Sequence, residues 1–166
     1  MGVEGVSADK DTPSAGECCC KALADNPVIP MGGIGLDELV FASFRQTVRH
    51  GCDQWWLYVS TCLACRQNWM IAQDDRIYDN YYLRRISPAQ LQEIEDFGLW
   101  PDEFLTYEQV LKLGKATGDV WAFLEPRSPA LVTTAEDLRR ERPDILVEEI
   151  AALLSITVQQ AVGLLG

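Results

Sequence analysis

The chain has 166 residues, of which 48% are hydrophobic, and this composition suits one domain with a core of its own. Its 14 basic and 25 acidic residues give a net charge of −11, which repels a phosphate backbone, so we expect no nucleic-acid partner. No apolar run approaches the ~20 residues that cross a bilayer, and the first residues lack the basic start and apolar stretch of a secretion signal, so we expect a cytoplasmic protein with no membrane partner.

The first part of the chain is expected to be irregular. Residues 1–17 combine Gly, Ser, Asp and Pro with few large apolar groups, which predicts a flexible tail before a single α+β domain over 18–166. Two prolines and three glycines in residues 26–35 predict a loop. An amphipathic helix is predicted over 36–48, with an apolar face made by Leu36, Leu39, Val40 and Phe44.

The next segments have the composition of a small sheet. Residues 53–75 are rich in aromatic and β-branched side chains on both sides of Cys62 and Cys65. This pattern predicts an antiparallel hairpin with the Cys-x-x-Cys pair at its tip. Residues 76–86 are expected to form a third strand, and residues 119–125 a further one.

Short helices are predicted in the C-terminal half. Four segments open with a hydroxyl residue followed three positions later by Gln or Glu, the pattern that caps a helix: Ser87 with Gln90, Thr106 with Gln109, Thr133 with Glu136, and Thr157 with Gln160. Gly114 is expected near a helix end. A helix within residues 144–154 is expected to bury Leu146, Ile150, Leu153 and Leu154.

The segment 149–165 resembles a helix-turn-helix unit. No Lys or Arg follows Arg142, however, and a DNA reader needs basic side chains on its second helix, so a packed helical hairpin is expected instead. The predicted fold class is therefore α+β, with a small antiparallel sheet built on the hairpin and packed against several short helices, most of them in the C-terminal half.

Six cysteines offer thiol or metal chemistry. The pair Cys62 and Cys65 resembles the knuckle of a zinc ribbon, in which two thiolates of a tight turn converge on one ion. Cys18 and Cys20 share one side of an extended segment that can reach this knuckle. The sequence therefore predicts a structural zinc site made by Cys18, Cys20, Cys62 and Cys65.

Other ligands and other uses of the thiols are less favoured. If residues 52–62 are extended they span about 33 Å at ~3.3 Å per residue, which places Cys52 and His50 too far from Cys62. Buried thiols without a metal are an alternative to the zinc site. A redox pair is a third hypothesis, but thioredoxin-type pairs begin a helix, and a strand-like segment follows Cys65.

No catalytic signature is present, and we expect the protein not to be an enzyme. A Ser-His-Asp triad would have to use the single histidine, His50, but the sequence has no G-x-S-x-G motif to supply the nucleophilic serine. A nucleobase deaminase would need a glutamate where Cys52 stands and a proline where Thr61 stands. The carboxylates of Asp74 and Asp75 are expected to form a solvated edge. A zinc-dependent enzyme or metal-regulated factor that uses the Cys-x-x-Cys centre is the alternative.

One segment is a candidate binding surface. No basic residue lies between Arg85 and Lys112, and aromatic residues alternate there with acids. Carboxylates attract a cationic partner from a distance, and aromatic anchors are typical of binding hot spots. The predicted partner-binding residues are Glu93, Glu95, Asp96, Trp100, Asp102, Glu103 and Glu108. Alternatively, the aromatic residues only attach the helices to the sheet.

These features predict an acidic protein-binding module that neutralises or regulates a basic protein partner. In composition the chain resembles toxin immunity proteins, which are small, acidic inhibitors of bacterial toxins, and this resemblance implies a toxin as the partner. A generic adaptor domain whose charge only confers solubility is the other binding hypothesis.

Overall fold

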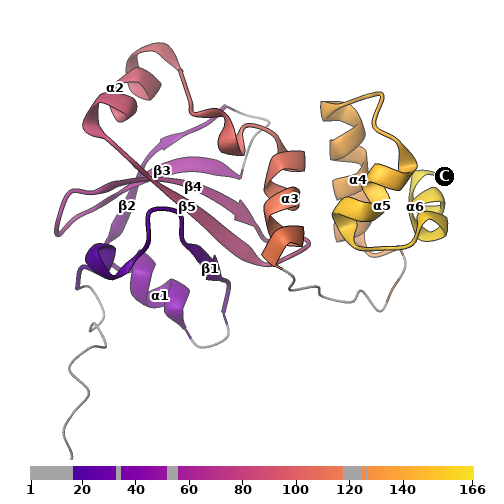
Figure 1. The fold of residues 1–166 in the computed structure, drawn as a ribbon, viewed down its shortest axis with the longest axis horizontal. Coiled ribbons are helices and arrows are strands. Elements are labelled where there is room, and N and C mark those ends of the chain that lie inside the picture. Colours follow the sequence, from indigo (N-terminus) through magenta and orange to yellow (C-terminus); the bar gives the residue numbers. More distant parts are fainter. Residues whose placement is uncertain (1–16, 33–34, 52–55, 118–124, 126) are drawn as a thin grey trace, which may run out of the picture.

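The computed structural model describes residues 17–32, 35–51, 56–117, 125 and 127–166 and confirms an α+β fold (Figure 1). Its centre is a five-stranded antiparallel sheet with the strand order β1-β5-β4-β3-β2. The strands are β1 (Val28–Pro30), β2 (Phe44–Arg49), β3 (Leu57–Cys62), β4 (Asn68–Asp74) and β5 (Asn80–Ile86). Apart from their last residues, Glu17 and Glu125, the predicted tail and the predicted strand over 119–125 lie outside the described residues.

Six α-helices and two short 3-10 helices complete the described part of the chain. The α-helices are α1 (Leu36–Phe41), α2 (Pro88–Phe97), α3 (Tyr107–Thr117), α4 (Pro129–Glu141), α5 (Val147–Leu154) and α6 (Val158–Leu165), and the 3-10 helices are η1 (Cys20–Ala22) and η2 (Asp102–Phe104). None of these helices alone is long and apolar enough to span a membrane. Together α5 and α6 meet that length and composition, but the pair is bent by 109° at its break.

Three of the four predicted capping pairs are confirmed. The Ser87, Thr106 and Thr157 hydroxyls accept the backbone N–H of the glutamine three residues later, and that glutamine accepts from the capping residue in return. The Thr133 prediction is wrong because α4 already begins at Pro129, capped by the Ser128 hydroxyl. Proline suits this first helical position, since no N–H is needed there.

The predicted helix over 36–48 is half wrong. It ends at Phe41, and β2 begins at Phe44 and pairs with β3. The residues that follow Phe44 are mostly polar, so a helix there would have little apolar surface to bury. Their backbone groups instead form hydrogen bonds with β3. The predicted loop over 26–35 likewise contains β1, and prolines are tolerated there because β1 is an edge strand.

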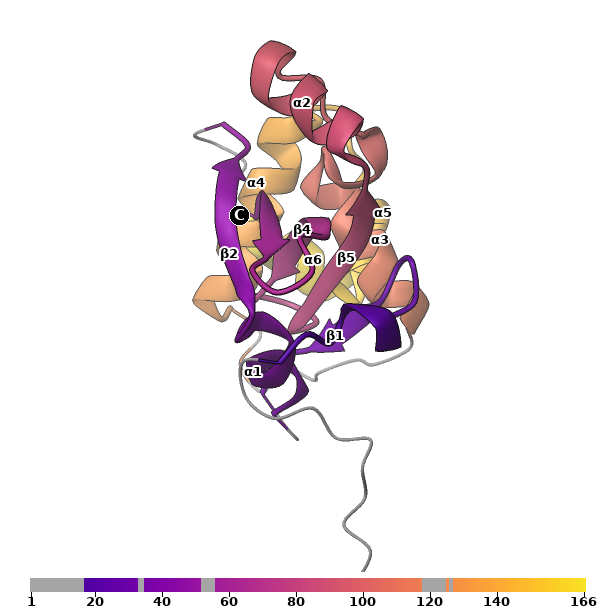
Figure 2. The same cartoon turned by 90° about the vertical axis from the view of Figure 1, so that its left-hand side faces the viewer.

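Both faces of the sheet are buried, because successive side chains on a strand point in opposite directions. We call one side the helical face; it carries Leu57, Val59, Met70 and Tyr82 and packs against α3 and the C-terminal helices. The other is the N-terminal face; it carries Tyr58, Trp69, Ile71 and Leu83, together with Ile29 of β1, and packs against η1 and α1. In Figures 1 and 2 the N-terminal segment and α1 lie on the opposite side of the strands from α3.

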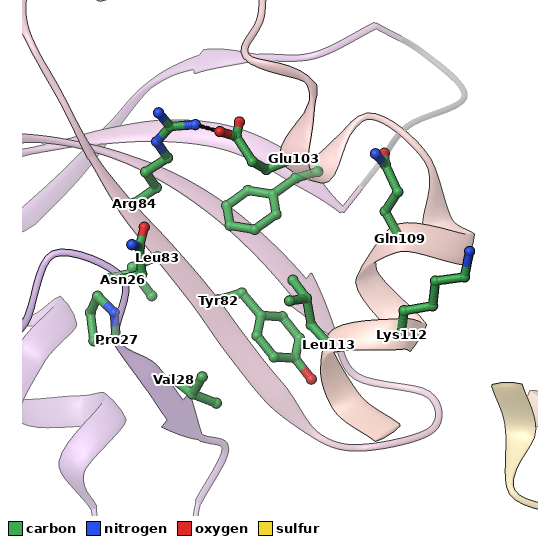
Figure 3. A pocket seen from close by; sticks show the side chains of 11 residues that line it. Asn26, Pro27, Val28, Tyr82, Leu83, Arg84, Glu103, Gln109, Lys112 and Leu113 are labelled. Atoms are coloured by element: carbon green, nitrogen blue, oxygen red, sulfur yellow. Dashed lines mark ion pairs between the residues drawn. The ribbon is translucent and has the colours of Figure 1, made fainter. Parts of the chain in front are cut away.

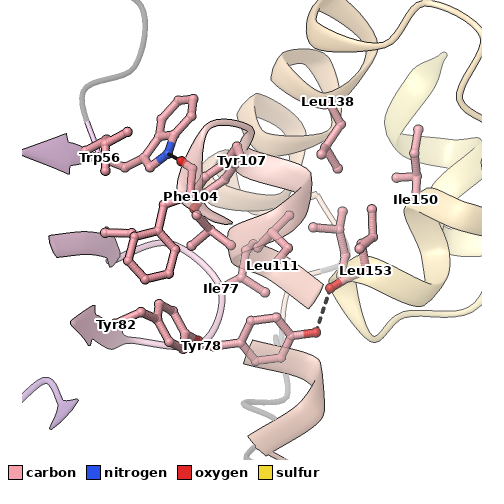
Figure 4. Packing of buried hydrophobic residues seen from close by; sticks show 14 of the residues in the cluster. Trp56, Ile77, Tyr78, Tyr82, Phe104, Tyr107, Leu111, Leu138, Ile150 and Leu153 are labelled. Atoms are coloured by element: carbon pink, nitrogen blue, oxygen red, sulfur yellow. Dashed lines mark hydrogen bonds between the residues drawn. The ribbon is translucent and has the colours of Figure 1, made fainter. Parts of the chain in front are cut away.

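Helix α3 lies between the sheet and α4–α6, and these layers share one core (Figure 4). The Tyr78 hydroxyl donates to the Leu153 carbonyl oxygen at 2.6 Å, which joins the β4–β5 turn to α5. The predicted buried face of α5 is confirmed for Ile150, Leu153 and Leu154, but Leu146 is exposed at the N-cap. Ile145 is buried in its place, because the chain is still extended before the helix begins.

Asp74 is fully buried, so its predicted place on a solvated edge is wrong. Its carboxylate accepts the backbone N–H groups of Arg76, Ile77 and Tyr78 at 2.9–3.1 Å. It also accepts the Tyr107 hydroxyl at 2.6 Å. These four donors replace the water that a buried carboxylate loses, and they tie the β4–β5 turn to the start of α3.

Gly114 lies near the end of α3, as predicted, and faces Tyr78 of the β4–β5 turn. A Cβ atom at this position would overlap the Tyr78 ring and come within 2.9 Å of the Tyr82 hydroxyl oxygen. We predict that Gly114→Ala lowers the free energy of unfolding by about 1–3 kcal/mol, because overpacking displaces a buried ring. Chemical denaturation measures this change.

Gly163→Ala is the matched control, because Gly163 also lies in a helix and a Cβ atom added there would meet no neighbouring group of the described chain within 4 Å. It is expected to leave the stability unchanged or to raise it by up to about 1 kcal/mol through helix propensity. Equal effects of the two substitutions would contradict the close packing of α3 on Tyr78.

Candidate metal centre

The four predicted metal ligands lie together. Cys18 and Cys20 come from the segment before β1, Cys62 is the last residue of β3, and Cys65 lies in the connection to β4. Their sulfur atoms all lie within 4.8 Å of one another, and no disulfide joins any of the cysteines in the described part of the chain. We call these four residues the cysteine centre.

The spacing of the sulfur atoms suits a single metal ion. Four thiolates bound tetrahedrally at ~2.3 Å from one ion lie about 3.8 Å apart, so small side-chain adjustments close the observed cluster around it. All four ligands come from the protein, which is typical of a structural site rather than a catalytic one with an open position. The cysteine centre can therefore hold a metal ion.

Backbone hydrogen bonds hold the turn that carries Cys62 and Cys65. The Cys62 N–H donates to the Gln67 carbonyl oxygen, and the Arg66 N–H donates to the Cys62 carbonyl oxygen, both at 2.9 Å. The Leu63 N–H donates to the Ser43 carbonyl oxygen at 2.7 Å, which ties the turn to the residue before β2. The turn is thus fixed without help from the N-terminal segment.

Hydrogen bonds also reach the sulfur atoms. Burial opposes ionisation of Cys62, but hydrogen bonds from the Ser43 hydroxyl and from the N–H groups of Cys65 and Ala64 outweigh it and lower the pKa of the Cys62 thiol to about 6. The Ser43 oxygen lies 3.4 Å from the Cys62 sulfur. Such donors to a ligand sulfur favour the thiolate that a metal requires.

Cys20 is anchored by the N-terminal face of the sheet. The Trp69 indole N–H donates to the Cys20 sulfur at 3.4 Å. The Arg85 guanidinium lies over the Trp69 ring, 4.3 Å from its centroid, and donates to the carbonyl oxygens of Cys20 and Leu23. Arg85 thus holds the N-terminal segment beside the cluster, a role that the sequence alone did not indicate.

Cys19 and His50 are not ligands of this cluster. Cys19 points away from it, toward α1, where its sulfur lies 3.7 Å from the Leu39 carbonyl oxygen, and burial raises the pKa of its thiol. His50 packs edge-on against Trp100 with ring centroids 4.9 Å apart. Its backbone N–H donates to the carbonyl oxygen of Leu57 at the start of β3, the end opposite Cys62. Cys52 lies outside the described residues.

The predicted partner-binding residues are not all available to a partner. Glu93, Glu95, Asp96 and Asp102 are exposed, and Trp100 is half-buried. Glu103 pairs with Arg84, and Glu108 pairs with Arg142 and Lys112. Among the aromatic residues of the segment, Phe104 and Tyr107 are buried in the core, as the structural alternative expected.

Two apolar residues beside these acids are exposed instead. Phe97 is 73% exposed and Leu99 is 60% exposed. The sequence could have indicated this pair, because both flank Gly98, the left-handed residue that ends α2 and turns the chain. We call Glu93, Glu95, Asp96, Phe97, Leu99 and Asp102 the α2 surface.

A pocket of about 600 Å³ lies between the β1–β5 edge of the sheet and η2 with α3 (Figure 3). Val28, Tyr82 and Leu113 contribute its apolar wall. Its charged residues are already engaged, Arg84 with Glu103 and Lys112 with Glu108. The pocket therefore presents no unmatched charge that would select a ligand.

Comparison with known proteins finds no protein-family model, no curated protein and no solved structure that matches the chain. Two features of the chain itself therefore bear on function. One is the cysteine centre, and the other is the α2 surface.

The hydrogen bond from Ser43 predicts a measurable pH effect. The folded-state pKa of Cys62 is below its ordinary value of 9.0, so between about 6 and 9 the unfolded chain binds a proton that the folded chain does not. The metal-free, reduced protein is expected to gain stability as the pH rises through this window, and to lose that contribution as the pH falls through about 6. Ser43→Ala removes one donor and is expected to reduce the gain, as measured by denaturant titration across the window.

Ser60→Ala is the control, because Ser60 is also a buried serine but lies within β3, away from the turn whose N–H groups reach the Cys62 sulfur. This substitution should leave the pH dependence intact. Identical pH profiles of the Ser43 and Ser60 variants would show that the Ser43 hydroxyl does not stabilise the Cys62 thiolate.

Proposed function

We propose that the protein is an acidic protein-binding module that neutralises or regulates a basic protein partner. The observation that carries this proposal is the α2 surface, in which two large, exposed apolar residues and four exposed acids fall within ten consecutive positions, 93–102. The absence of any basic residue between Arg85 and Lys112 supports the choice of a cationic partner. The net charge of −11 supports it as well.

Helix α2 is built as a rigid projection. A capping box at Ser87 fixes its start, and Gly98 in the left-handed conformation fixes its end. Ile94 is its only buried residue, and α2 lies at the margin of the molecule in both views (Figures 1 and 2). Because α2 buries so few of its side chains against the rest of the protein, most of its surface is available to a partner.

The chemistry of the α2 surface combines attraction with anchoring. Carboxylates raise the rate of encounter with a basic protein, and this effect weakens as salt screens it. Phe97 and Leu99 add apolar area that becomes buried only in a complex, and central residues of that kind carry most of the binding free energy of an interface. Together they suit an inhibitor that covers a cationic site, such as that of a bacterial toxin.

A metal-regulated factor is the second candidate, and the exposure of Cys65 favours it. The other three cysteines of the cysteine centre are buried or half-buried. Solvent and small reagents therefore reach the cluster at the exposed Cys65. A regulated site needs such an opening, whereas a purely structural site does not.

Photo-crosslinking tests the binding proposal. A benzophenone-bearing amino acid in place of Leu99 keeps the surface largely intact and should capture a basic protein in cells. Capture is expected to fall steeply at high salt. Phe97→Ala in the same crosslinking protein should lower capture about 10-fold or more, as loss of a hot-spot ring does.

The same photo-reactive residue in place of Leu146 is the matched control, because Leu146 is also about 60% exposed but lies at the start of α5. Capture of the same proteins from both positions, or capture that is indifferent to salt and to Phe97→Ala, would argue against the α2 surface as a docking site.

A further inference from the structure

We propose that the cysteine centre binds one zinc ion. This ion fastens residues 18–30, which we call the covering segment, to the sheet. The proposal is independent of the α2 surface. It rests on the origin of the four ligands, since two belong to the covering segment and two to the turn beyond β3.

Few buried side chains hold the covering segment, residues 18–30. Of residues 18–30, only Cys19, Cys20 and Ile29 are fully buried. The strand β1 pairs with β5 over three residues, and the Leu83 and Arg85 N–H groups extend this pairing to the Pro27 and Asp25 carbonyl oxygens. The Arg85 side chain adds hydrogen bonds to two carbonyl oxygens and an ion pair with Asp25, which is exposed. The free energy gained by burying so few side chains offsets only part of the entropy cost of ordering these thirteen residues. A bound ion supplies the additional restraint.

The two halves of the centre differ in how firmly they are held. Cys62 and Cys65 lie at a turn that is held by its own backbone bonds, by Ser43 and by the pairing of Cys62 with Phe44 of β2. Cys18 and Cys20 lie in the segment that needs the restraint. The Cys62–Cys65 pair is therefore already in place on the sheet, and an ion bound there recruits Cys18 and Cys20.

Zinc is the ion that this donor set selects. A single ion with four thiolates and tetrahedral geometry is typical of zinc, and no open position or exchangeable ligand is needed. The Trp69 indole N–H donates to the Cys20 sulfur, and the Ser43 hydroxyl oxygen lies 3.4 Å from the Cys62 sulfur, where it can donate to a metal-bound thiolate as outer partners of structural zinc sites do.

Removal of the ion should then uncover one side of the molecule. The N-terminal face carries Trp69, Ile71 and Leu83, which are fully buried beneath η1 and α1. The helical face has its own cover, and none of the centre's ligands belongs to it. Loss of zinc is thus expected to loosen the N-terminal cover while the core beneath α3 stays folded.

Two measurements on the purified, full-length wild-type chain test the proposal. Elemental analysis is expected to give one zinc per chain, and X-ray absorption is expected to give four sulfur ligands at ~2.3 Å. Hydrogen exchange before and after chelation under reducing conditions should show loss of protection in residues 18–30 and retention in residues 107–117. Another metal, no metal, or unchanged hydrogen exchange in residues 18–30 after zinc removal would overturn the proposal.

A pair of adjacent substitutions sharpens the test. Cys18→Ser removes a half-buried ligand and should lower zinc affinity at least 10-fold with the same local loss of protection. Cys19→Ser changes the next residue, whose sulfur points toward α1, and should retain one zinc. Equal zinc content in both variants would refute the ligand assignment, and if Cys18→Ser fails to fold, the chelation experiment on the wild-type chain decides.

Discussion

The fold depends on one constraint: the central sheet is apolar on both sides and needs two covers. Side chains alternate along β3, β4 and β5, so Leu57 and Met70 face one way while Trp69 and Ile71 face the other. The C-terminal helices cover the helical face with an extensive core. The N-terminal face is left to a short segment with little apolar surface, and the cysteine centre lies at the end of that segment.

A second feature fixes how the helices meet the sheet. The buried carboxylate of Asp74 accepts three backbone N–H groups of the β4–β5 turn and the Tyr107 hydroxyl. The same turn presents Tyr78, whose hydroxyl reaches Leu153 and whose ring lies against Gly114. Because every group in this polar cluster has a partner, burial of the charge orients α3 and α5 instead of weakening the core.

The candidate site could be predicted only in part from residue types. Cys62 and Cys65 were identifiable because a Cys-x-x-Cys turn brings two sulfur atoms together whatever the rest of the fold does. The reason for including Cys18 and Cys20, a shared side of an extended segment, is wrong because Cys20 begins η1, although both sulfur atoms do lie in the cluster. Sequence spacing could not predict that Arg85 and Trp69 support Cys20. Sequence spacing also could not predict which acids are free to meet a partner. Glu103 and Glu108 form ion pairs with residues that are distant in the chain or on the next helical turn.

By itself the sequence determined the local features: the α+β class, the capped starts of α2, α3 and α6, the β3–β4 pair and the four candidate ligands. These depend on neighbours within a few residues, whose side chains and backbone contact one another in any fold. Tertiary structure alone decided that residues 44–49 form a strand and that Asp74 is buried. It also decided that Phe97 stays in solvent, because each of these outcomes depends on which distant segment covers the residue.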